Sequence, residues 1–169
     1  MVKDIIGMCV LCVLLVLCQI LIFNHIAIFN VAFPIIFIYF IIRLPISLNL
    51  SHLFTISFLL GFIIDVFSDT LGVNALSCTL IAALKRPAFF AYVDKDDKTK
   101  NLVPTIRNLG FSTYSKYLLT LVSIYCFLVF IIEYFSFADV KELVLLSVSS
   151  AALTFVTLLA LDCLVITKS

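Results

Sequence analysis

Long apolar stretches separated by short polar breaks are the main pattern along this chain. Each is a candidate for a helix that crosses a bilayer, which needs about 17 to 25 residues, although two are somewhat short. The runs predict six transmembrane helices in a single integral membrane domain, residues 1–169. They cover residues 5–23, 26–42, 53–67, 71–84, 117–135 and 143–166.

The apolar residues within each run are continuous and do not alternate with polar ones. A membrane-spanning β-barrel strand would alternate, so the runs favour helices, which satisfy their own backbone hydrogen bonds in lipid. Composition agrees, because 64% of the 169 residues are apolar and 12% are charged. A water-soluble domain is about half apolar and a quarter charged. The predicted fold class is therefore an all-α membrane protein, a six-transmembrane-helix bundle.

Two prolines modify this pattern. Pro34 lies inside the second run, where it predicts a bend, because proline has no N–H to donate. The fourth run is short and stops at Lys85, Arg86 and Pro87. It requires either a thinner bilayer or an extension along the interface through residues 88–93.

The basic residues give the predicted bundle an orientation. If the N-terminus is cytoplasmic, ten of the eleven Lys and Arg residues fall on the cytoplasmic side, and only Lys141 lies outside. Both termini and the basic loop, residues 85–116, are then cytoplasmic. We expect this loop to lie against anionic membrane lipid or to dock cytoplasmic partners, and Arg43 to be an interfacial anchor. The loop residues proposed for this role are Lys85, Arg86, Lys95, Lys98 and Lys100.

Catalysis and cofactor binding have little support in the sequence. The six cysteines all lie in apolar runs, and no cluster of ligands predicts a metal site. No G-x-S-x-G or H-E-x-x-H motif is present. The formal net charge of +1 gives no pull toward nucleic acid. We therefore expect no enzyme activity, no cofactor and no nucleic-acid partner.

The stretch around residues 61–75 is the candidate site. A carboxylate in a membrane helix costs about 2.5 to 3.5 kcal/mol at the centre, so it needs a partner, water or the interface. One interpretation is partner binding, with the glycines allowing close backbone approach. The other is structural, with the acids capping helices and bonding amides near Leu71 and Gly72. A proton or ion relay is a third, less supported reading. The site residues are Gly61, Asp65, Asp69, Gly72 and Asn74.

These motifs in order resemble the MreD family of rod shape-determining membrane proteins. The resemblance rests on Leu44-Pro45, Gly61-x-x-x-Asp65, Thr70-x-Gly72-x-x-Ala75 and Arg86-Pro87. It implies a non-catalytic scaffold of the bacterial cell-wall elongation complex in the cytoplasmic (inner) membrane. The implied main partner is MreC, with MreB, RodA and its transpeptidase reached indirectly.

The resemblance also supplies an alternative. The MreD fold is thought to be similar to the substrate-binding S components of energy-coupling vitamin transporters. Such proteins usually dock their coupling subunit through an Ala-x-x-x-Ala face on the first span, and residues 5–23 contain no alanine. A transport role is therefore the second hypothesis.

Overall fold

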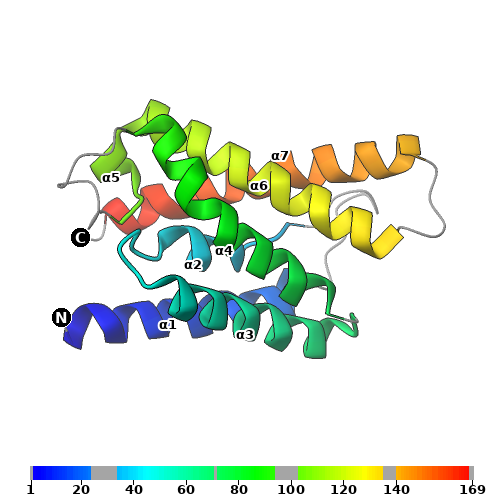
Figure 1. The fold of residues 1–169 in the computed structure, drawn as a ribbon, viewed down its shortest axis with the longest axis horizontal. Coiled ribbons are helices and arrows are strands. Elements are labelled where there is room, and N and C mark those ends of the chain that lie inside the picture. The colour runs from blue at the N-terminus through cyan, green and yellow to red at the C-terminus, as the bar shows by residue number, and fades with distance from the viewer. Residues whose placement is uncertain (1, 24–33, 71, 94–102, 135–139, 168–169) are drawn as a thin grey trace.

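A computed structural model of the protein describes residues 2–23, 34–70, 72–93, 103–134 and 140–167, and all regular structure within these ranges is helical (Figure 1). The long helices are α1 (Val2–Cys18), α3 (Leu50–Ser68), α4 (Val73–Tyr92), α6 (Phe111–Tyr134) and α7 (Val140–Thr167). The short elements are a turn of π-helix, η1 (Gln19–Phe23), and the helices α2 (Ile38–Arg43) and α5 (Ile106–Leu109).

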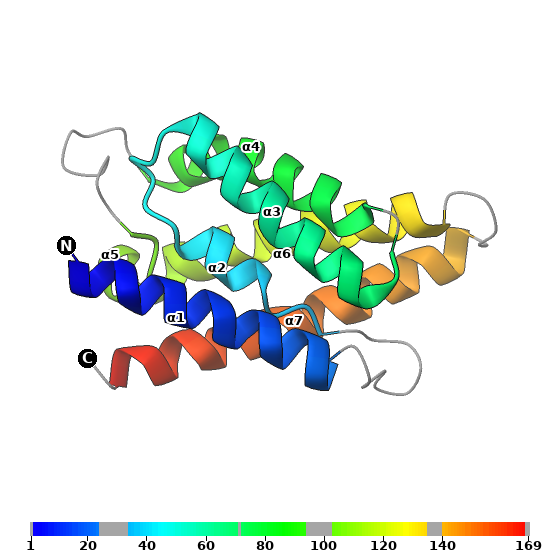
Figure 2. The same ribbon diagram turned by 90° about the horizontal axis from the view of Figure 1, so that it is seen from below.

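The helices run back and forth along one long axis (Figure 1, Figure 2). α1, α3 and α6 run in one direction, and α2, α4 and α7 return. α3 packs on α4, α4 on α6 and α6 on α7. We call the end where α1 begins and α7 finishes the N/C end. The opposite end, where Asp69 and Gly72 join α3 to α4, is the turn end.

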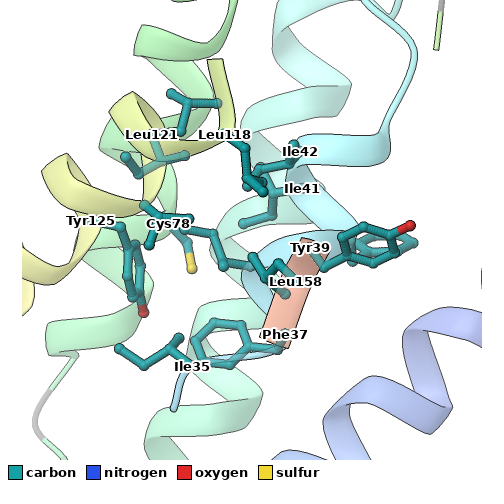
Figure 3. Close-up of a cluster of buried hydrophobic side chains, with 14 of the residues drawn as sticks. Ile35, Phe37, Tyr39, Ile41, Ile42, Cys78, Leu118, Leu121, Tyr125 and Leu158 are labelled. Atoms are coloured by element: carbon teal, nitrogen blue, oxygen red, sulfur yellow. The ribbon is translucent and has the colours of Figure 1, made fainter. Parts of the chain in front are cut away.

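A short buried segment forms the centre of the fold. Every residue from Pro34 to Ile42 is buried, and α2 contacts α1, α4 and α6. The ring of Phe37 meets that of Tyr125 edge to face, with 6.0 Å between their centroids. Side chains from α4, α6 and α7 complete this apolar layer (Figure 3). They include Cys78, Leu118, Leu121 and Leu158.

Polar side chains from distant helices satisfy the backbone of this central segment. The Gln19 side chain donates to the carbonyl of Pro34 (3.2 Å) and accepts from the N–H of Ile36 (2.8 Å). The N–H of Ile35 donates to the Thr154 hydroxyl (3.0 Å). A buried backbone group without a partner is costly, and non-helical backbone at membrane depth is tolerated only inside protein or beside water. These three bonds allow the extended segment to lie in the core.

The outward faces of the long helices are apolar. On α3, seven large apolar side chains are between 43% and 63% exposed: Leu50, Phe58, Leu59, Phe62, Ile63, Val66 and Phe67. Within the described residues, three helical stretches are long and apolar enough to cross a membrane, Leu50–Ser68, Phe111–Ile132 and Val144–Cys163, and Gly7–Leu21 is a shorter apolar one. In a soluble protein such surface would drive aggregation, whereas lipid tails solvate it. The fold is therefore compatible with a membrane helical bundle.

The second predicted span, residues 26–42, is not one continuous helix. Residues 26–33 lie outside the described ranges, and helix begins only at Ile38. Pro34 therefore precedes a helix and does not bend one, contrary to the prediction. A short apolar run does not distinguish a helix from a buried extended segment, which explains the error.

The end of the fourth predicted span, at residue 84, is also wrong. α4 continues through Lys85, Arg86 and Pro87 to Tyr92, as in the alternative of an extended helix. Charge and proline predicted a helix end. Tertiary contacts override them, because both cations have carbonyl partners and Phe89 beyond the proline is fully buried.

The predicted basic loop, residues 85–116, is correspondingly shorter. α4 occupies its beginning, and α5 and the first turn of α6 occupy its end. Lys95, Lys98 and Lys100 lie outside the described residues. The other predicted stretches are helical: residues 5–23 in α1 and η1, 53–67 in α3, 117–135 in α6 as far as Tyr134, where the described range ends, and 143–166 in α7.

Candidate functional site

The Asp65 carboxylate joins α3 to α4 at the turn end. It is only 3% exposed. Its Oδ1 accepts hydrogen bonds from the Thr70 hydroxyl, the Asn74 N–H (3.0 Å) and the Asn74 side-chain amide (3.0 Å). Its Oδ2 accepts from the Ala75 N–H (2.8 Å). The Tyr125 hydroxyl on α6 donates to Oδ1 of Asn74 (2.7 Å). We call these five residues the Asp65 network.

The Asp65 side chain caps the N-terminus of α4. The first amides of a helix have no partner within it, and the side chain of the N-cap residue normally accepts from the second or third. The N-cap of α4 is Gly72, which has no side chain. Asp65 supplies the missing acceptor from the neighbouring helix, bonding Asn74 and Ala75. Its negative charge is also favoured at a helix N-terminus.

Gly61 allows the two helices to approach closely. A Cβ at this position would lie 2.6 Å from the Cα of Ala75 and 2.6 Å from the carbonyl oxygen of Asn74. Only glycine fits without moving α3 away from α4. The close approach expected at Gly61 thus occurs within the chain, one helical turn from Asp65.

Asp69 and Gly72 shape the turn between these helices. Asp69 is the C-cap of α3 and has the left-handed conformation (φ 58°), and its N–H donates to the carbonyl of Asp65. Asp69 is exposed. It does not share a helical face with Gly61 and Asp65, because α3 ends at Ser68. Gly72 also has positive φ (79°), but open space surrounds its α-carbon. A glycine is therefore favoured at position 72 by the positive φ, and not by close packing against a neighbouring helix.

The geometry bears on both interpretations of the predicted site. For Asp65 the geometry favours the structural interpretation. Its carboxylate bonds the amides of Asn74 and Ala75, whereas the prediction named amides near Leu71 and Gly72. The chain itself satisfies this carboxylate, so no outside donor is needed. Asp69 is exposed and remains available for contact.

A second polar network, not predicted from the sequence, lies at the N/C end. Asp162 on α7 is fully buried. The Tyr39 hydroxyl donates to its Oδ1, and the Ile106 N–H donates to its Oδ2 (3.0 Å). Arg43 donates to the Tyr39 hydroxyl (3.0 Å). We call these four residues the Asp162 network, and it ties α2, α5 and α7 together.

Lys85 and Arg86 hold the connection between α2 and α3. The Lys85 side chain, predicted to be a surface anchor, is 1% exposed, and its Nζ donates to the carbonyls of Ile41 (2.8 Å) and Leu44. These carbonyls close the C-terminus of α2, where the helix dipole favours a positive charge. Arg86 donates to the carbonyl of Leu48. Both cations therefore have structural partners inside the chain.

Most of the basic side chains that the structure describes belong to elements toward the N/C end. Arg43 ends α2, Arg107 lies in α5, Lys116 lies in the first two turns of α6, and Lys85 and Arg86 lie in the second half of α4, which runs toward that end (Figure 1). Lys141 lies at the start of α7, at the turn end, where α3 also ends (Figure 1).

Comparisons of the chain with protein-family models, curated proteins and solved structures found no match. The resemblance to the MreD family therefore rests on the chain's own residues. Within the described part of the chain, no group of three or more His, Cys, Asp or Glu side chains is arranged to hold a metal ion.

Proposed function

We propose that this chain is a non-catalytic membrane scaffold of the bacterial cell-wall elongation complex, which acts in cell-shape determination by binding MreC. The supporting observation is that the residues of the resemblance meet in space. Gly61 packs on Ala75, and Asp65 bonds Thr70. These motif residues therefore form one joint between α3 and α4.

The proposal includes six membrane crossings with both termini in the cytoplasm. The alternating direction of the helices supports it (Figure 2), as does the gathering of basic side chains at the N/C end. Cytoplasmic ends of membrane helices carry an excess of Lys and Arg. The N/C end then faces the cytoplasm and the anionic lipid of the inner membrane, and the turn end faces outward.

The contact with MreC is placed at the turn end. Asp65 is buried and bonded within the chain, whereas Asp69 is exposed, so Asp69 is the acidic residue of the site that a partner can reach. The exposed aromatic face of α3 leads up to it through Phe62 and Phe67. The span or the external coil of MreC would meet this surface, and MreB, RodA and its transpeptidase would be reached through MreC.

Copurification with MreC from membranes tests the proposal. The decisive variant is Asp69→Asn, because asparagine tolerates the left-handed conformation and leaves the fold intact. Normal abundance with lost MreC recovery supports contact at the turn end. Normal recovery from Asp69→Asn and from Phe62→Ala removes the turn end as the contact. No recovery of MreC with the unmodified chain rejects the scaffold role, and stabilisation by one member of a vitamin panel would favour the transporter alternative.

Topology has its own test. In a background without the six native cysteines, we expect Ser47→Cys to be labelled only from the cytoplasm and Lys141→Cys only from outside. Both positions are exposed, at opposite ends of the bundle. Labelling of both from one side contradicts the proposed orientation.

A further inference from the structure

Two tyrosine hydroxyls on α6 are buried at the N/C end without a hydrogen-bond partner. Tyr114 and Tyr117 are both 0% exposed. Neither hydroxyl has a partner among the described residues. Native structures satisfy nearly all buried polar atoms, and leaving one unmet costs about 1 to 3 kcal/mol. Two such hydroxyls three residues apart, on one face of one helix, therefore require an explanation.

The Tyr114 hydroxyl has polar surroundings, whereas the Tyr117 ring packs edge to face on Phe89 and has Tyr114 as its polar neighbour. Tyr114 lies within electrostatic range of Asp162, Tyr39, Arg43 and Tyr117. Each carboxylate oxygen of Asp162 receives one hydrogen bond within the chain. A carboxylate oxygen can accept two, so Asp162 keeps acceptor capacity. Hydroxyl donors and a carboxylate acceptor thus share a region without bonding one another directly.

We propose that Tyr114 and Tyr117 form an internal hydration site, in which bound water links α6 to the Asp162 network. Water is the ligand class that fits, because it is small and both donates and accepts, and a buried water usually has two to four polar partners. The proposal is independent of the scaffold function.

The apolar core limits which polar network the water can join. The apolar layer containing Phe37, Ile41 and Leu118 lies between the side chains of Tyr39 and Tyr125 (Figure 3). Tyr125 and Tyr39 border this layer and bond to opposite networks. Within the described residues, this apolar layer therefore separates the proposed hydration site from the Asp65 network.

X-ray radiolytic footprinting of the intact protein in micelles tests this site. Radiolysis of a bound water produces hydroxyl radicals in place, so a buried tyrosine beside it is oxidised. Tyr125 is the matched control, because it is also 0% exposed but its hydroxyl is bonded to Asn74. We expect Tyr114 and Tyr117 to be oxidised several-fold faster than Tyr125. Equal rates for all three would overturn the proposal.

Removal of the hydroxyls gives a second, independent readout. If water bonds them, Tyr114→Phe and Tyr117→Phe should lower the melting temperature, as we expect of Tyr125→Phe, which loses the bond to Asn74. If they have no partner, deleting a buried unsatisfied hydroxyl leaves the melting temperature unchanged or raises it. The latter result in both variants contradicts bound water.

Discussion

The Asp65 network and the Asp162 network are both built around a buried carboxylate, but they connect different kinds of helices. Asp65 accepts four hydrogen bonds and, with Tyr125, connects α3, α4 and α6. Asp162 accepts bonds from Tyr39 and Ile106, and the Ile106 bond fastens α5, which has no buried residue of its own. One carboxylate therefore supports the packing of three long helices, whereas the other joins the short helices α2 and α5 to α7.

The largest expected effect is that of Asp65→Ala. It removes the acceptor of four donors, including two amides at the start of α4. We expect the free energy of unfolding, measured by SDS titration in micelles, to fall by about 4 kcal/mol. Asp69→Asn is the control and should change it little, since Asp69 is exposed. A loss below about 1 kcal/mol in Asp65→Ala would show that the network is not a structural joint.

Asp162→Ala should have a smaller and more local effect. We expect a loss of about 3 kcal/mol in unfolding free energy, since two donors lose their acceptor. Hydrogen exchange at the Ile106 amide should accelerate at least about tenfold, the equivalent of 1.4 kcal/mol. Tyr39→Phe removes one bond to Asp162 and leaves the Ile106 bond, so it should not accelerate this amide. Equal acceleration in both variants would mean that Asp162 does not hold α5 directly.

Gly61→Ala tests the close packing beside Asp65. The new Cβ would meet Ala75 and Asn74 at 2.6 Å, so α3 and α4 must separate. We expect a loss of about 2 kcal/mol in the same SDS titration, typical of an overpacked contact. Gly7→Ala is the matched control, since nothing lies within 4 Å of a Cβ there. Equal stability of the two variants would contradict the close packing of α3 on α4 at Gly61.

The smallest expected effect is that of Gly72→Ala. Open space surrounds the position, so only the strain of positive φ (79°) remains. This strain costs about 1 kcal/mol for an L-residue, and Gly72→Asn should cost less, because asparagine tolerates the left-handed region. Thermal unfolding distinguishes the two causes. If strain dominates, the alanine variant has the lower melting temperature; if steric contact dominates, the asparagine variant, with the larger side chain, has the lower one.

The two networks differ in how visible they are in the sequence. Asp65 is conspicuous because an acid in an apolar run is costly, and its main-chain partners lie within ten residues of it. Tyr39 and Asp162 are separated by 123 residues, and no periodicity connects them. The sequence therefore points to Asp65 and Asn74 of the first network, but not to Tyr125 or to the second network.

The fold shows the same division between local and distant information. Apolar length is enough to predict α1, α3, α6 and α7. The extended backbone before α2 depends on Gln19 and Thr154, which are remote in the chain. The continuation of α4 past Pro87 depends on Lys85 reaching the end of α2. Both features are decided by tertiary partners that outweigh local propensity, so a pattern along the chain does not predict them.

The extended segment also constrains the order of events during synthesis in a membrane. The N–H of Ile35 bonds to Thr154, which leaves the ribosome more than a hundred residues later. Until α7 is inserted, this amide has no partner in the chain, and lipid offers none. The early part of the protein must therefore stay near water or the insertion machinery until the last helix arrives. A chain truncated before α7 should remain associated with that machinery and be a substrate for membrane proteolysis.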